Sequence, residues 1–254
     1  MEKHKVWISN EVFNWRCYSN GGGFVDSEKW KRAYYIWEYA KNLIENASSD
    51  FQLADGVANL KRSLNQRLQL IEEIYNFRSI SNVNKQKRYL ELLEAFGIVR
   101  PLFMKKLMLV RNDIEHNDAK PPNVDRCLEL LDVVWYFLRS TDFIVQLRRY
   151  EATFDKLDSE GYETQYSFSL NVDHAAEKLY KISGWFPTDY ISEEFQNDYV
   201  EVIVKKYEDK KAYEGSPLEE LHDDKLESDK LIQGYFQFTS EDKKKIIPLV
   251  LYAI

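Results

Sequence analysis

The stretch LELLEAFGIVRPLFMKKLMLVRNDIEHNDAKPPNVDRCLELLDVVWYFL, residues 90–138, decides how the first part of the chain is interpreted. Its apolar residues recur at three- and four-residue spacing, which is typical of amphipathic helices. Gly97 stands where a helix ends in a left-handed residue, and Pro101 suits the first turn of the next helix. The Pro-Pro pair at 121–122 then ends that helix. The stretch therefore predicts three successive helices joined by short connections.

Two more helices are expected before this stretch. The first begins after a capping residue at Asp26 or Ser27, and the second covers about residues 53–77. Helices joined by short connections lie mostly antiparallel to their neighbours. The sequence therefore predicts an all-α helical bundle over residues 28–150, preceded by an irregular or short-strand lead-in over residues 1–27.

After about residue 158 the hydrophobic pattern changes to a period of two. Alternating runs rich in β-branched and aromatic residues predict strands. The expected strands are YETQYSFSLNV (162–172), SGWFPTDYI (183–191), DYVEVIVKKYE (198–208) and LIQGYFQFT (231–239). A short helix over 174–182 and a terminal helix or strand over 241–254 complete the prediction. We thus expect an α+β chain, with a small antiparallel-sheet α+β domain over residues 158–254 after the helical bundle.

The charge is distributed unevenly between these two parts. Residues 1–150 contain 23 Lys+Arg against 19 Asp+Glu, whereas residues 151–254 contain 12 against 23. This break predicts two units with different partners. Because an acidic surface repels nucleic acid, the second unit is not expected to bind one. Binding of a partner, sensing of a small molecule and shielding of the basic helical part all stay open for it.

The composition also excludes several classes of protein. The chain has 254 residues and a formal net charge of −7, and its 9 Gly and 6 Pro are too few for a disordered chain. No apolar run approaches the ~20 residues that span a bilayer, and the first residues lead into no signal-peptide core. Cys17 and Cys127 cannot build a disulfide framework, and the histidines are scattered. We therefore expect a cytoplasmic protein without membrane association, metal or cofactor.

One short pattern in the chain carries chemistry. Arg111 is followed directly by Asn112, and His116 comes five residues after the arginine. All three lie in the helix that is expected between Pro101 and the Pro-Pro pair at 121–122. In its helical setting over residues 90–138, this pattern resembles the HEPN superfamily, the all-α domains found in many RNases of host-defence and toxin–antitoxin systems. The family hallmark is an arginine followed after four to six residues by a histidine, often with an asparagine directly after the arginine. The resemblance covers the helical part, about residues 28–150, and no other part of the chain.

The resemblance implies a metal-independent endoribonuclease with Arg111 and His116 as its catalytic pair. The 2′-hydroxyl of the RNA would be the nucleophile, which explains selectivity for RNA over DNA. An imidazole can transfer protons near neutral pH, and a guanidinium can stabilise a phosphorane-like transition state. Asn112 can orient a phosphate or fix the imidazole tautomer.

The chain departs from one family pattern at Asp118. HEPN toxins that are controlled by nucleotidyltransferase antitoxins often carry a tyrosine at this position, two residues after the histidine.

Helix geometry bears on how such a site is assembled. At 3.6 residues per turn, Asn112 and His116 lie about 40° apart, whereas Arg111 and His116 lie about 140° apart. The Arg111 and His116 side chains of one motif therefore point in different directions and cannot easily contact the same phosphate. Two motifs that face each other across a twofold axis can place side chains on both sides of one phosphate, and the family also implies a dimeric site. We expect a homodimer with the motif helices near the axis, and with an antitoxin or other regulatory partner.

Three lysines flank the motif and are candidates for RNA-phosphate contacts: Lys105, Lys106 and Lys120. An equally good interpretation is that these lysines lie on a water-exposed face of a helix and contact no RNA. Two further basic groups lie upstream, namely Lys61, Arg62 and Arg67 on the polar side of the second helix, and Lys85, Lys87 and Arg88.

Other interpretations of the motif stay open. Arg111 and Glu115 form an ordinary i,i+4 pair, and a histidine near a helix C-terminus is favoured by the helix dipole. A non-catalytic HEPN module could dimerise and present the C-terminal domain to a partner or ligand. A helical protein outside the family, with a coincidental motif, would have no site at all.

Overall fold

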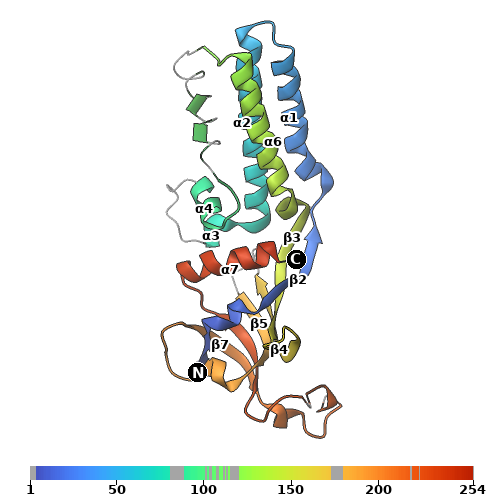
Figure 1. Cartoon of the computed structure of the whole chain (residues 1–254), viewed down its shortest axis with the longest axis vertical. Coiled ribbons are helices and arrows are strands. Elements are labelled where there is room, and N and C mark those ends of the chain that lie inside the picture. The colour runs from blue at the N-terminus through green and yellow to red at the C-terminus, as the bar shows by residue number, and fades with distance from the viewer. Residues whose placement is uncertain are drawn as a thin grey trace. The chain divides into compact units, whose positions relative to one another are not determined.

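The computed structural model describes residues 4–80, 89–100, 120–172, 180–217, 219–222 and 224–253, together with Leu102, Lys105, Lys106, Leu109, Val110, Asn112 and Ile114. The chain has an α+β architecture with an antiparallel sheet, as predicted. It divides into two compact units (Figure 1). The sheet unit consists of Met1–Gly22 and Arg149–Ile254, and the helical unit consists of Gly23–Arg148.

The described residues of the helical unit include three long helices and two short ones. They are α1 (Ser27–Glu45), α2 (Asp50–Tyr75), α3 (Phe77–Ile80), α4 (Tyr89–Ala95) and α6 (Val124–Gln146). The long helices α1, α2 and α6 pack against one another. The inward face of α1 consists of Ala33, Trp37, Ala40 and Ile44, at the three- and four-residue spacing that the sequence shows.

Side chains and left-handed residues fix the ends of these helices. Asp26 caps α1 by accepting a hydrogen bond from the Glu28 amide, which confirms one of the two expected capping residues. The second helix begins at Asp50 and ends at Tyr75, a few residues from the expected limits. It ends there because Asn76 takes the left-handed conformation, with φ of 47°.

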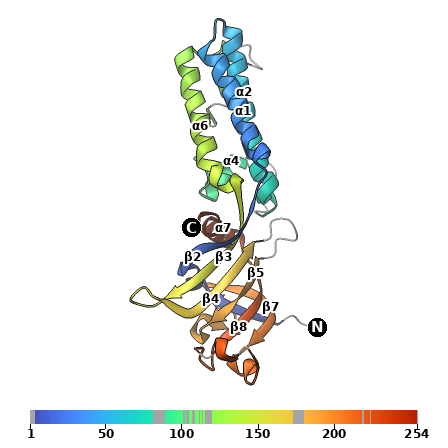
Figure 2. The same cartoon turned by 90° about the vertical axis from the view of Figure 1, so that its right-hand side faces the viewer.

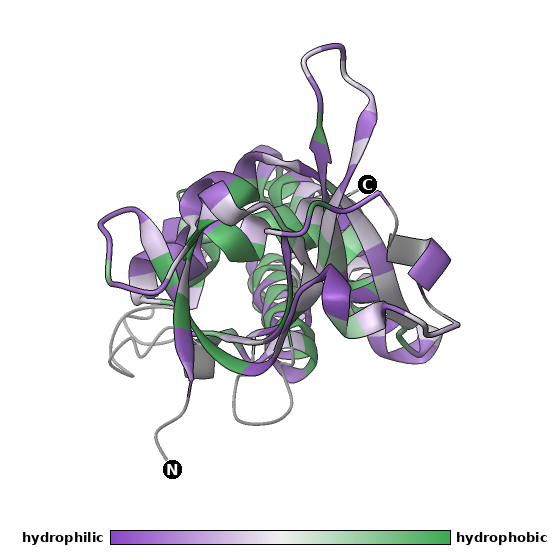
Figure 3. Ribbon diagram, turned by 90° about the horizontal axis from the view of Figure 1, so that it is seen from below, coloured by the Kyte–Doolittle hydropathy of each residue, from purple (hydrophilic) through white to green (hydrophobic). Residues whose placement is uncertain are grey.

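The sheet unit is built on eight strands in the order β2-β3-β4-β5-β8-β7-β1-β6 (Figure 2). The strands are β1 (Lys5–Ser9), β2 (Arg16–Phe24), β3 (Leu147–Leu157), β4 (Glu163–Val172), β5 (Tyr180–Phe186), β6 (Ile191–Ser192), β7 (Tyr199–Glu208) and β8 (Lys230–Phe236). The pairs β3–β4, β4–β5, β5–β8, β8–β7 and β7–β1 are antiparallel. Seen from below in Figure 3, the strands curve strongly.

One face of this sheet carries the core of the unit. The buried residues of β4 are Tyr166, Phe168, Leu170 and Val172, which alternate with partly exposed residues as a period of two requires. The short 3-10 helix η1 (Asn10–Asn14) and the terminal helix α7 (Ser240–Tyr252) bury apolar residues in the same cluster. The terminal segment, expected as a helix or a strand, is therefore a helix in spite of Pro248.

The extent of this unit differs from the expectation at three places. The segment 1–27, expected as an irregular or short-strand lead-in, supplies β1 and β2 to the sheet, and β1 pairs with β7 far along the chain. After α6 ends at Gln146 the chain continues without a loop into β3, so the sheet resumes at Leu147 and not at about residue 158. Residues 180–182 of the expected helix 174–182 belong to β5, and 174–179 lie outside the described residues.

Candidate functional site

The predicted catalytic pair falls in the least described part of the chain. Arg111 and His116 lie outside the residues that the structure describes. Asn112 is described, has helical backbone and carries an exposed side chain. The described residues around it, Leu109, Val110 and Ile114, are helical as well. The geometry of the three motif side chains relative to one another therefore stays a prediction.

The three candidate phosphate-binding lysines have different surroundings. Lys105 forms an ion pair with Glu91 of α4, with Nζ 3.2 Å from Oε1. Lys106 and Lys120 have exposed side chains. The Glu91 carboxylate therefore already balances the charge of the Lys105 ammonium.

Arg67, which the sequence placed in an exposed basic row on α2, is completely buried. Its Nη1 donates to the Leu138 carbonyl at 3.0 Å, to Thr141 Oγ1 at 3.1 Å and to Asp142 Oδ1 at 2.9 Å. All three acceptors belong to α6, so this arginine joins two helices and is not available to RNA. The sequence contained the signal, since Arg67 is three residues after Leu64 and four before Ile71 on the apolar stripe.

Tyr34 of α1 belongs to the same buried network. Its hydroxyl donates to Asp142 Oδ2 at 2.8 Å. Burial raises the pKa of Tyr34 to about 12, and the hydrogen bond to the Asp142 carboxylate adds to the shift. The network around Arg67 thus contacts all three long helices and has a structural role.

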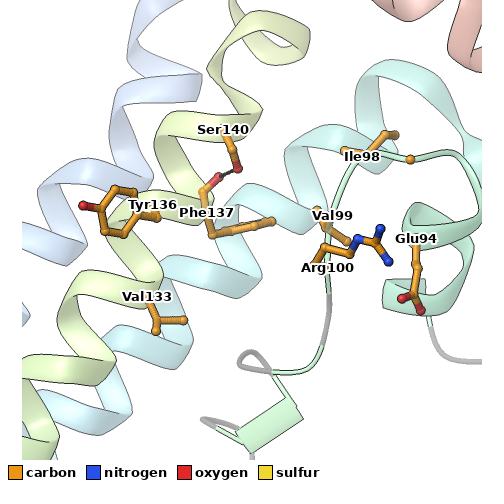
Figure 4. A pocket seen from close by; sticks show the side chains of 9 residues that line it. Glu94, Ile98, Val99, Arg100, Val133, Tyr136, Phe137 and Ser140 are labelled. Carbon is orange, nitrogen blue, oxygen red and sulfur yellow. Dashed lines mark hydrogen bonds between the residues drawn. The ribbon is translucent and has the colours of Figure 1, made fainter.

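A cavity of about 690 Å³ lies between α6 and the segment that follows α4. From α6 it is lined by Val133, Tyr136, Phe137 and Ser140, and from the other side by Glu94, Gly97, Ile98, Val99 and Arg100. Figure 4 shows the α6 side chains and the 98–100 segment on opposite sides. The sequence alone does not reveal this cavity, because its two walls are far apart along the chain. One of its lining residues, Arg100, directly precedes the segment that carries the Arg111 motif.

A smaller cavity of about 330 Å³ lies in the sheet unit and is lined in part by Trp15, Arg16, Lys156 and Tyr190. Arg16 forms ion pairs with Asp155 and Glu163. The Lys156 ammonium lies 4.8 Å from the centre of the Tyr190 ring. Both cations therefore already have favourable contacts within the protein.

Cysteine and metal chemistry find little support in the described residues. Burial raises the pKa of both the Cys17 and the Cys127 thiol to about 11, so neither forms a thiolate readily near neutral pH. No group of three or more His, Cys, Asp or Glu side chains in the described part of the chain is placed to hold a metal ion. Among the same residues, no helix is long and apolar enough to cross a membrane.

Comparisons with protein-family models, with curated proteins and with solved structures found no match for this chain.

Proposed function

We propose that this protein is a metal-independent endoribonuclease of the HEPN type, acting in a toxin–antitoxin or anti-phage defence system. The observation that carries the proposal is the motif formed by Arg111, Asn112 and His116 in a helical setting. Helix α4 precedes the motif and the long helix α6 follows it. The described residues of the motif segment itself are helical. These observations support an all-α HEPN-like bundle that ends with α6 at Gln146, a few residues before the expected limit at 150.

The proposed chemistry needs neither a metal nor a cofactor. His116 of one protomer removes the proton from the 2′-hydroxyl of the substrate, and the 2′-oxygen forms a bond to the adjacent phosphorus. The bond between phosphorus and the 5′-oxygen breaks, and the 5′-oxygen takes up a proton and leaves as a hydroxyl, so that a 2′,3′-cyclic phosphate remains. Arg111 stabilises the negative charge that develops on the phosphate oxygens, and Asn112 orients the phosphate or the imidazole. In a homodimer the two motifs would supply an acid and a base from opposite protomers.

Cleavage of RNA in the presence of EDTA tests this proposal. We expect the wild-type protein to cleave total RNA or tRNA and to leave 2′,3′-cyclic phosphate ends. Arg111→Ala and His116→Ala should each lose cleavage by about a hundredfold or more, because each removes a group that acts in the transition state. Arg32→Ala, which changes an exposed arginine of α1, is the matched control and should cleave like the wild type.

The alternative is a non-catalytic HEPN module that presents the sheet unit to a partner or ligand. It is favoured by the independent core of that unit and by its exposed apolar side chains Tyr162, Phe195 and Leu226. Well-folded wild-type dimers that leave RNA intact would contradict the nuclease and support this alternative. A monomer in solution would contradict both.

A further inference from the structure

We propose that the cavity between α6 and residues 94–100 binds one unpaired base of a single-stranded RNA, with Arg100 on the adjoining phosphate. This inference rests on the proposed ribonuclease function, and it deepens that function by naming the form of RNA and the place where a nucleotide is held.

The size and the walls of the cavity suit a planar base. Its volume of about 690 Å³ lies within the range of roughly 300–1,000 Å³ of pockets that hold small ligands. Val133 and Phe137 form an apolar wall on α6, and Val99 lies on the opposite wall (Figure 4). Unpaired bases bury their flat faces against apolar and aromatic side chains.

Tyr136 adds an aromatic surface at the rim of this cavity, because its ring points away from residues 98–100 in Figure 4. Its side chain is 67% exposed although it is large and mostly apolar. Its ring makes an edge contact with the Trp135 ring, with centroids 5.1 Å apart, which orients it. Stacking on an exposed tyrosine tolerates every base, because every base has a π-face. The pair therefore offers a stacking surface beside an apolar cavity.

The charged groups of the cavity complement a nucleotide. Arg100 is exposed and lines the cavity, and its guanidinium makes no ion pair with another described residue. An exposed guanidinium is suited to bind phosphate in a bidentate manner. The Glu94 carboxylate, which also lines the cavity, can accept hydrogen bonds from the amino or imino groups of a base.

The neighbourhood favours RNA over an apolar helix of a partner protein. Lys105 is held by Glu91, which lies on α4 one turn before Glu94, so a second cation is close to the same helix. Arg100 and Lys105 both precede Arg111 in one segment. A partner helix would bring an apolar surface against the Glu94 carboxylate and the Arg100 guanidinium, and it would remove water from these charged groups.

RNA-binding measurements on the full chain test this proposal. In a His116→Ala background that prevents cleavage, fluorescence anisotropy would compare a short labelled single strand with a duplex of the same sequence. The single strand should bind more tightly. Tyr136→Ala should weaken its binding by about tenfold. Arg100→Gln should weaken it severalfold and reduce the slope of log K against log salt by about one.

Matched variants on the other helices serve as controls. Tyr39→Ala removes a tyrosine of α1 that is 59% exposed and does not line the cavity. Arg32→Gln removes an exposed arginine of α1 that does not line the cavity. Both should bind single-stranded RNA like the parent protein. Val133→Trp, which fills the cavity without changing charge, should weaken binding as Tyr136→Ala does.

The outcomes separate this proposal from the nuclease proposal. If the wild type cleaves RNA and the cavity variants bind like their controls, the base site alone is overturned. If the cavity variants lose binding but the wild type never cleaves, the base site is supported and the nuclease is contradicted. Absence of RNA binding overturns both. If light scattering shows that Tyr136→Ala dissociates a dimer while RNA affinity is unchanged, the cavity belongs to a protein interface and the base site is overturned.

Discussion

The Arg67 side chain shows how one residue can connect three helices. It lies on α2 and donates hydrogen bonds to α6, and its Nη2 reaches the Trp30 carbonyl of α1 at 3.4 Å. Asp142 balances its charge and also accepts from Tyr34 and Arg139. A buried charge is tolerated only when it is paired and hydrogen-bonded in this way.

Replacement of Arg67 by Met is therefore expected to destabilise the helical unit strongly. Met fills most of the space but leaves Asp142 without its buried partner, and breaking a buried ion pair from one side costs about 3–5 kcal/mol. Urea unfolding followed by circular dichroism would measure the change in the free energy of unfolding. Arg62→Met, at an exposed site on the same helix, should change it by less than about 0.5 kcal/mol. Equal stability of the two variants would contradict a structural role for Arg67.

At the scale of elements, strand spacing in the sheet depends on glycine at two positions. A Cβ at Gly184 of β5 would overlap the Ser167 carbonyl oxygen of β4, and one at Gly234 of β8 would overlap the Ile203 carbonyl oxygen of β7. These neighbouring strands can approach so closely only where a side chain is missing. The register also shifts between Val204 and Lys206 of β7, which bends that strand.

Gly184→Ala should separate β4 from β5 and lower stability. Overpacking at a well-packed site costs about 1–3 kcal/mol, so we expect a loss of that order in the free energy of unfolding. Gly23→Ala is the matched control, because a Cβ at Gly23 of β2 would meet nothing within 4 Å. Thermal unfolding of both variants would measure the difference. If the Gly184→Ala protein is as stable as Gly23→Ala, β4 and β5 can separate with little loss in the free energy of unfolding, which contradicts this prediction.

For the whole molecule, the helical unit is one continuous piece of chain and the sheet unit is not. Residues 23–148 lie between the two pieces of the sheet unit, which are 1–22 and 149–254. Each unit has its own buried apolar residues. A domain usually folds independently when its residues are continuous in sequence and enclose a hydrophobic core.

The piece 23–148 is therefore expected to fold alone. Expressed by itself, it should give a helical circular dichroism spectrum and a cooperative thermal transition. The piece 149–254 lacks β1 and β2, which pair within the sheet, and should not fold without residues 1–22. Joining 1–22 to 149–254 through a short glycine-rich linker should restore the sheet. A cooperative fold of 149–254 alone would contradict the contribution of β1.

The sequence alone determined the elements whose patterns are local. Neighbouring residues are enough to predict these elements, because each pattern repeats within a few positions. They are the cap at Asp26, the helical periods of α1, α2 and α6, and the two-residue period of β4. It also supplied the motif at Arg111 and His116, which stays a prediction because both residues lie outside the described part of the chain.

Only the tertiary structure decided what depends on residues distant in sequence. It placed β1 beside β7, buried Arg67 against α6, and left the Phe195 side chain 72% exposed. It also brought Val133 of α6 opposite Val99 to form the cavity. In each case local sequence gives a residue's polarity and period, whereas burial and pairing depend on which distant segment packs against it.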